Sequence, residues 1–287
     1  MDARLPHAIV TALLEGRCRE PFGVLGNHPW EDDGRTGRVV RAFLPWAADV
    51  TLVHADGSET WMEPAHEGGL FMGVFPGEPA FFTYRLAATD RRGQRWVLED
   101  PYRFPPFLDE ERVRAFLRGE EPRVHQVLGA RPMVHEGVAG VGFAVWAPHA
   151  QAVNLMGTMN RWEGRCHPMR PRGATGVWEL FVPGAGKGAV YKYEIVTASG
   201  RKVDKADPCG SAMELRPATA SVVWDPSGYV WSDAAWMEAR RSWDQGSAPV
   251  SVYEAHLGSW KRVPMEERDE GSHGWPGYRA LADDLLP

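Results

Sequence analysis

The sequence predicts a mainly β protein: two tandem immunoglobulin-like β-sandwiches, followed by the first βα unit of a parallel α/β domain. Two observations lead to this fold class. The chain repeats itself once, and each copy consists of short alternating apolar runs that are separated by Gly, Pro and Asp turns. After the second copy, the pattern changes to an apolar run, a long loop and an amphipathic helix.

The repeat is visible by comparing the chain with itself. ALLEGRCREPFGVLG (12–26) aligns without gaps on AFLRGEEPRVHQVLG (115–129), at an offset of 103 residues. Two copies of this size indicate tandem domains, because solenoid units are shorter and need at least three copies. The same offset of 103 aligns Val50 with Val153. The second copy then has four added residues, after which an offset of 107 aligns Tyr84 with Tyr191 and the Asp-Pro pair at 100–101 with the pair at 207–208.

Each copy is expected to open with a short helix. In the first copy, Leu13 and Leu14 belong to an apolar helical face that Gly16 ends. In the second, Asp109 can cap EERVRAFL (110–117) through its side chain.

Four alternating runs follow in each copy. Period two places Tyr191 and Tyr193 on one face of their strand, with Lys192 and Glu194 on the other. Runs of this length between such turns are typical of an antiparallel sandwich. The runs are RVVRAFLPW, DVTLVHA, LFMGVFPG and FFTYRLAATD in the first copy, and VGFAVWAP, AVNLMG, VWELFVPG and AVYKYEIVTASG in the second.

Composition excludes several classes of partner. A net charge of -6 and a pI near 5.9 argue against nucleic acid or a membrane surface. Cys18, Cys166 and Cys209 are an odd number without CxxC spacing, which fits neither a disulfide framework nor a zinc cluster and indicates a reducing compartment. No secretory signal or membrane-spanning run is visible, so we expect a cytoplasmic protein without a metal or cofactor.

The four added residues of the second copy fall between Met156 and Trp178. Insertions on a rigid scaffold are where binding surfaces are commonly built. This one brings Asn160, Trp162 and His167 close together, and the flat indole of a tryptophan suits stacking on a sugar ring. The alternative is a longer, inert loop, with its tryptophan used for packing.

Catalytic signatures are absent from the sequence. It contains no P-loop, no HExxH, no GxSxG and no GxGxxG that opens a helix. Glycosidic chemistry requires two converging carboxylates, about 5–5.5 Å apart in retaining enzymes. The acidic clusters instead lie in expected turns, helix starts or exposed faces, so we assign no catalytic residue.

The C-terminal segment differs from both copies. PVSVYEAHLGSW (249–260) reads as a strand buried on both faces. YRALADDLLP reads as a helix with Tyr278, Leu281, Leu285 and Leu286 on one face. This is the start of a parallel α/β domain, whose further strands are expected beyond the chain. The predicted domains are 1–108 and 109–226 for the two sandwiches, 227–248 for a linker, and 249–287 for the incomplete α/β domain.

Several segments carry a family resemblance. VYEAHLGSWKR, followed by a Tyr-Arg-x-Leu-Ala helix, resembles the opening of the catalytic (β/α)8 barrel of 1,4-α-glucan (glycogen) branching enzymes, in glycoside hydrolase family 13. PFGVLGNHP, VGFAVWAPHAQAVNLMGTMNRW and YKYEI resemble their extra N-terminal domain and their family-48 carbohydrate-binding module. The chain is thus identified as resembling the N-terminal portion of that family.

The resemblance implies a retaining transfer of an α-1,4-glucan segment to a 6-hydroxyl, which forms the branches of glycogen. Its catalytic residues are expected on later barrel strands, outside this chain. The implied partners are an α-glucan and the protein's own C-terminal barrel. Two alternatives remain: a non-catalytic glycogen-binding fragment, or another family-13 enzyme such as a maltooligosyltrehalose trehalohydrolase.

The resemblance also implies three carbohydrate-binding residues, which are Asn160, Trp162 and Lys192. The family's G-x-x-N-x-W pattern falls on Gly157, Asn160 and Trp162, and its polar sugar contact falls on Lys192. The segment between Gly200 and Pro208 lacks the second aromatic platform of glycogen-binding relatives. The alternative is that the module packs on the barrel rather than binding glycan.

Overall fold

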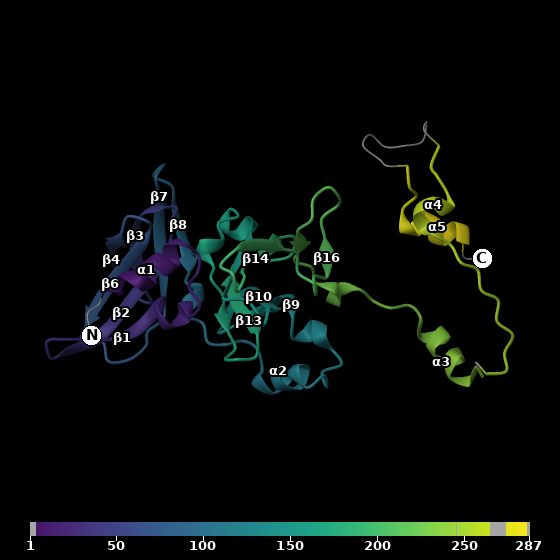
Figure 1. The fold of residues 1–287 in the computed structure, drawn as a ribbon, viewed down its shortest axis with the longest axis horizontal. Helices are drawn as coiled ribbons and strands as arrows, with labels where there is room; N and C mark the ends of the chain where they lie inside the picture. The colour runs from purple at the N-terminus through teal and green to yellow at the C-terminus, as the bar shows by residue number, and fades with distance from the viewer. Residues whose placement is uncertain (1–3, 245, 265–273, 286–287) are drawn as a thin grey trace. The chain divides into compact units, whose positions relative to one another are not determined.

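The computed structural model describes residues 4–244, 246–264 and 274–285. The chain forms two compact units, Met1–Gly228 and Tyr229–Pro287 (Figure 1). The first unit contains both copies of the repeat, and the second contains the C-terminal segment.

The first copy is a pair of antiparallel sheets that enclose an apolar core. Helix α1 (His7–Leu14) and the short helix η1 (Pro21–Gly23) precede the sheets. Val40, Leu52, Phe71 and Leu86 come from four strands and meet in one buried cluster. One sheet has the order β1 (Gly26–Asp32), β2 (Arg35–Phe43), β6 (Leu70–Pro76), β5 (Glu63–His66), and the other β4 (Glu59–Trp61), β3 (Ala47–His54), β7 (Tyr84–Asp90), β8 (Arg95–Glu99).

The second copy repeats this plan. Before its sheets come η2 (Pro101–Arg103), α2 (Glu110–Leu117) and η3 (Val124–Gln126). Strand order β1-β2-β6-β5 recurs as β9-β10-β13-β12, so the predicted repeat is confirmed at the level of topology. The first sheet has the order β12 (Arg170–Pro171), β13 (Val177–Pro183), β10 (Val138–Trp146), β9 (Gly129–His135), and the second β11 (Ala152–Gly157), β14 (Val190–Val196), β17 (Ser221–Val222), β16 (Ala212–Met213), with β15 (Lys202–Lys205) paired to β14.

A buried hydrogen bond marks the same point in both copies. The Tyr84 hydroxyl donates to Asp100 Oδ2 at 2.5 Å, and the Tyr191 hydroxyl donates to Asp207 Oδ2 at 2.7 Å. In the second copy Tyr193 also donates to Asp207 Oδ2, at 3.2 Å. Unpaired polar groups in a core are costly, so each tyrosine and aspartate stabilises the other's burial.

The two sandwiches of the first unit are joined by a shared core and by specific hydrogen bonds. Leu13 and Tyr102 of the first copy pack in the same buried cluster as Leu155 of the second. The Tyr102 hydroxyl donates to the carbonyl oxygens of Cys166 (3.3 Å) and Pro168 (3.2 Å). Residues 4–228 therefore form one packed unit in which each sandwich positions the other.

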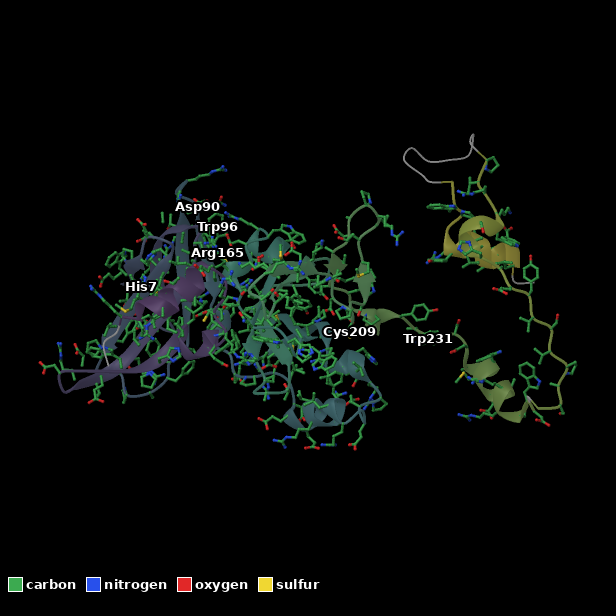
Figure 2. The ribbon with its side chains drawn as sticks, in the orientation of Figure 1. His7, Asp90, Trp96, Arg165, Cys209 and Trp231 are labelled. Atoms are coloured by element: carbon green, nitrogen blue, oxygen red, sulfur yellow. The ribbon has the colours of Figure 1, made fainter. Side chains whose placement is uncertain are left out.

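The N-terminal segment covers part of the outer face of β11 and its neighbours. Asn154 Nδ2 donates to Gly16 O at 2.7 Å, and Arg165 Nη1 donates to Leu14 O at 3.1 Å. Arg165 is labelled in Figure 2, close to the boundary between the two sandwiches. The α1 end is consequently held against the second copy, and Gly16 there has the positive φ (+64°) that its position as a helix stop requires.

The second unit has helices but lacks the predicted strand. Its elements are α3 (Ala234–Ser242), α4 (Leu257–Trp260) and α5 (Tyr278–Leu285). The expected helix near the end is confirmed over residues 278–285, and Leu286 of the predicted helical face lies outside the described residues. The segment 249–260, predicted as the first barrel strand, does not form one: residues 250–256 have no regular secondary structure, and residues 257–260 form α4. Val250 and Val252 are 72% and 87% exposed. A strand is held by ladder hydrogen bonds to neighbours, and the described part of this unit offers no strand to pair with.

Membrane-spanning helices and metal-ligand clusters are both absent from the described residues. None of their helices combines the length and the apolar content needed to cross a membrane. Across the same part of the chain, no group of three or more His, Cys, Asp or Glu side chains is placed to hold a metal ion. All three cysteines are free thiols.

Candidate functional site

The inserted residues lie at the edge of a sheet, directly after β11. In the first copy, residues 55–62 lead from β3 to β5 through a tight turn and the short strand β4. In the second copy, residues 158–169 make the same connection from β11 to β12 with four residues more. They form two short helices, η4 (Thr158–Asn160) and η5 (Gly164–Cys166), instead of a strand. We call residues 157–162 the tryptophan loop.

Asn160 holds the tryptophan loop together from inside. Its side chain is buried, with 8% exposure. Oδ1 accepts the N–H of Gly157 at 2.9 Å, while Nδ2 donates to Leu155 O at 2.8 Å and lies 3.0 Å from His167 Nδ1. Both ends of the amide are engaged by the protein, so the structure gives Asn160 a positioning role within the loop.

His167 is the partly buried partner of that amide. Since Asn160 Nδ2 is a donor, Nδ1 of His167 acts as the acceptor. Burial lowers the pKa of His167 to about 4, because the charged imidazolium is poorly solvated there. The ring is therefore neutral at physiological pH, and its pairing with Asn160 is intact.

The last two residues of the loop have an unusual backbone. Arg161 and Trp162 both adopt left-handed conformations, with φ of +56° and +64°. Such conformations cost roughly 1–2 kcal/mol for residues other than glycine and persist where the surroundings hold them. Here the Trp162 N–H donates to Gly157 O at 2.8 Å and closes the loop. The Trp162 side chain is 40% exposed, which leaves an indole surface open to solvent.

Lys192 lies on the neighbouring strand, at the same end of the sheet. The register pairs Lys192 of β14 with Met156, the residue just before the loop. Tyr191 and Tyr193 are buried on the inner face of β14, so Lys192 lies on the outer face, as its alternation predicts. Its Nζ donates to Thr219 Oγ1 at 2.8 Å. The fold thus places Lys192 on the strand next to β11, the strand that leads into the tryptophan loop, while Asn160 lies in the interior of that loop.

Sequence reasoning missed Arg161, which links the tryptophan loop to the first copy. Its guanidinium carbon lies 5.6 Å from the ring centroid of Trp46 and 5.2 Å from that of Trp96. The only sequence signal was the position of Arg161 inside the G-x-x-N-x-W pattern. The two tryptophans lie more than 60 residues earlier, so local pattern could not reveal the contact.

The buried carboxyls of the first unit are structural. Burial raises the pKa of Asp100 to about 6 and also raises the pKa of Asp207, although their tyrosine hydrogen bonds act in the opposite direction. Glu179, which is fully buried, is paired with Arg170 (2.9 Å) and Arg172 (3.0 Å). Each of these acids is engaged by protein groups, and none has the geometry of a catalytic pair.

The tryptophan loop that follows β11, with its partly exposed indole, is thus the candidate ligand-binding surface of the two joined sandwiches. Residues 127–210 match the family described as carbohydrate-binding module 48 (isoamylase N-terminal domain). Residues 6–102 match the N-terminal domain of the alpha-1,4-glucan branching enzyme GlgB. The resemblance of the chain to the N-terminal part of branching enzymes, with a family-48 module, is thereby confirmed.

Curated relatives extend the similarity along almost the whole chain. The 1,4-alpha-glucan branching enzyme GlgB of Paramagnetospirillum magneticum is 48% identical over 275 residues, which is 96% of this chain and 35% of the relative. GlgB of Rubrobacter xylanophilus is 46% identical over 280 residues, 97% of this chain and 37% of the relative. GlgB of Synechococcus elongatus is 39% identical, with 97% and 38% covered. The chain therefore spans between a third and two fifths of the length of these relatives.

Proposed function

We propose that this chain is the N-terminal part of a 1,4-α-glucan branching enzyme of glycogen biosynthesis. The observation that carries the proposal is the similarity to GlgB proteins, which runs through both sandwiches and the C-terminal segment. The reaction is a retaining double displacement that moves an α-1,4-glucan segment to a 6-hydroxyl. We place its carboxylates in the part of the relatives' length that this chain does not match.

The predicted domains form part of this proposal. Residues 1–108 and 109–226 are the two sandwiches, 227–248 a linker, and 249–287 the start of a (β/α)8 barrel. The apolar residues 250–253 would become a strand once neighbouring barrel strands supply hydrogen-bond partners, which accounts for their exposure in this structure. The free thiols support a reducing, cytoplasmic location.

Within this chain, we assign α-glucan binding to the tryptophan loop and Lys192. Trp162 would supply a stacking platform, since its indole is partly exposed on a closed loop. Lys192 would supply a polar contact to a sugar hydroxyl from the next strand. Asn160 would act by holding the loop rather than by touching the sugar, because its amide is already bonded at both ends.

Affinity electrophoresis in glycogen-containing gels tests the assignment. Trp162→Ala should reduce the retention of the 287-residue chain, since one stacking platform contributes about 0.5–1.5 kcal/mol. The matched control is Trp61→Ala, in the equivalent connection of the first copy, where the indole is 58% exposed and its N–H donates to Asp49 Oδ1. Equal retention of wild type and Trp162→Ala would contradict a glycan-binding role and favour packing on the barrel.

The iodine spectrum of amylose tests where the chemistry resides. The purified 287-residue chain should leave this spectrum unchanged, whereas the same chain continued with a complete barrel should change it. Branching by the 287-residue chain alone would show that the catalytic carboxylates lie within these residues, against the proposal.

A further inference from the structure

A cleft of about 510 Å³ lies where the two sandwiches of the first unit meet. Trp46 and Trp96 line it from the first copy, and Arg161 and His167 line it from the second. Figure 2 labels Trp96, which extends from β8. Volumes of about 300–1,000 Å³ are typical of sites for small molecules and short oligomers. Trp162, the next residue after Arg161, does not line the cleft.

Two tryptophans with perpendicular rings form one wall of the cleft. The rings of Trp46 and Trp96 have centroids 5.5 Å apart and an interplanar angle of 89°. Both side chains are only partly buried, so indole surface faces the cleft. Perpendicular indoles offer two apolar faces at different angles, which suits successive rings of a curved oligosaccharide.

Three side chains that line the cleft have N–H groups that donate to no other group in the part of the chain that the structure describes. Among the described residues, neither the indole N–H groups of Trp46 and Trp96 nor the guanidinium of Arg161 has a hydrogen-bond or ion-pair partner. The nearby acids do not neutralise Arg161: Glu99 is paired with Arg103 at 2.6 Å, and Asp100 is bonded to Tyr84. Seven N–H donors are thus available beside two apolar faces.

The backbone of Arg161 is a second, independent sign of function. Arg161 is held in the left-handed region, as is Trp162, although neither is glycine. Strain of this kind is found at binding and catalytic sites, where surrounding structure maintains it. Here the loop around Arg161 is closed by the hydrogen bonds of Asn160 and by the bond from the Trp162 N–H to Gly157 O. The Arg161 guanidinium lies over two tryptophans of the other sandwich.

We propose that this cleft is a second binding site for an α-1,4-glucan segment. Apolar ring faces of the glucosyl units stack on Trp46 and Trp96, and their hydroxyls accept hydrogen bonds from Arg161. The inference rests on the proposed α-glucan binding of the chain. The tryptophan loop then contributes to two sites: Trp162 belongs to the site proposed above, and Arg161 belongs to the cleft. A long glucan that reaches both is then retained more strongly than a short one, because the second contact is intramolecular.

Fluorine NMR of the full 287-residue chain labelled with 5-fluorotryptophan tests the cleft directly. Single Trp→Phe variants assign the resonances of Trp46, Trp96, Trp162 and Trp61. Titration with maltohexaose should shift the Trp46 and Trp96 resonances saturably, and should do so also in the Trp162→Ala background. The Trp61 resonance should not move.

Matched variants supply the second readout. In calorimetric titrations of the Trp162→Ala background, Trp96→Ala and Arg161→Gln should each weaken maltohexaose binding, by about 3- to 10-fold. Trp61→Ala should change it less than twofold. Arg161→Gln keeps the loop's length and polarity, so it tests the cleft even if Trp96→Ala loosens the contact between the sandwiches.

The outcomes separate this inference from the proposed function. If only the Trp162 resonance shifts, the cleft proposal is overturned and α-glucan binding by the loop stands. If no tryptophan resonance shifts, α-glucan binding by the chain fails altogether. If maltohexaose leaves Trp46 and Trp96 unchanged but a sugar phosphate shifts them, the cleft serves an anionic ligand and the proposal is likewise overturned.

Discussion

The two copies of the repeat share a framework and differ at one sheet edge. Both have the same strand order in one sheet, and both bury a tyrosine hydrogen-bonded to an aspartate. After β3, the first copy makes a tight turn and adds strand β4, which covers that edge. After β11, the second copy instead forms the tryptophan loop and η5. The two copies thus share a scaffold, and the candidate binding surface lies where the second copy has a loop in place of a strand.

The main hydrophobic cores of the two copies also differ in which residues they include: one contains residues of both copies, and the other contains residues of the first copy only. The main core of the second copy continues into the first through residues such as Leu13 and Tyr102, whereas the main core of the first copy is a separate cluster. Trp178 belongs to the shared cluster, and its repeat partner Phe71 belongs to the separate one. Damage to the shared cluster should therefore affect both sandwiches.

The largest expected effect tests this difference. Trp178→Ala and Phe71→Ala should each lower the free energy of unfolding by about 3–5 kcal/mol, because both side chains are almost fully buried. In urea unfolding followed by fluorine probes, Trp178→Ala should shift the transitions of both sandwiches. Phe71→Ala should shift mainly the first. Equal shifts in both copies for the two variants would break the distinction between the clusters.

His167 should make the second copy sensitive to acid. Its pKa is lowered to about 4 in the folded protein, so the folded state resists protonation that the unfolded chain accepts near 6.5. Stability from this group is present above pH 6.5 and is lost as pH falls toward 4, on the order of 3 kcal/mol in total. His167→Asn, which keeps an acceptor, should lose less stability than wild type between pH 7 and 4. If the free energies of unfolding of the two proteins changed with pH in parallel, the lowered pKa of His167 would be contradicted.

Asp100 should make the first copy respond to pH in the opposite sense. Its pKa is raised to about 6 by burial, so the folded state binds a proton more tightly than the unfolded chain. Its favourable contribution is full below pH 4 and declines by on the order of 3 kcal/mol as pH rises through 6. Asp100→Asn should therefore be more destabilising, relative to wild type, at pH 4 than at pH 7. A cost that does not change with pH would rule out the raised pKa.

The smallest effect concerns the opening helices. Asp109 caps α2 by accepting the N–H of Arg112 at 3.0 Å, whereas α1 begins after Pro6 without a side-chain cap. Asp109→Ala should cost about 1 kcal/mol in thermal or urea unfolding. The exposed pair of Arg114 and Glu110 on the same helix serves as control, because Arg114→Ala should cost at most about 0.5 kcal/mol. A larger loss for Arg114→Ala than for Asp109→Ala would refute the cap.

Much of the fold was accessible from the sequence because its patterns are local. AVNLMG coincides with β11, and the alternation around Tyr191 and Tyr193 gives the correct inner face of β14. Strand β1 (GNHPWED) was missed, since its proline and polar residues resemble a loop. The apolar run at residues 250–256 was assigned to a strand that is not formed, because apolar pattern alone does not supply the partners a strand requires.

The local arrangement of the candidate site followed from the sequence only in part, and its binding role stays a prediction. An exposed Trp162 follows from a tryptophan between polar and glycine residues in an insertion. The inward direction of the Asn160 amide does not follow, because an asparagine that holds a loop and one that contacts a sugar look alike in sequence. The contact of Arg161 with Trp46 and Trp96 depends on how the copies pack, which no local window contains.

Amide chemical-shift mapping with maltoheptaose compares the two copies in one sample. The largest saturable shifts should fall on residues 157–162 and on Lys192, while the matching turn of the first copy, residues 55–58, should stay unchanged. Shifts centred on residues 55–58, or none at residues 157–162, would contradict the claim that the replaced strand of the second copy is the glucan-binding edge.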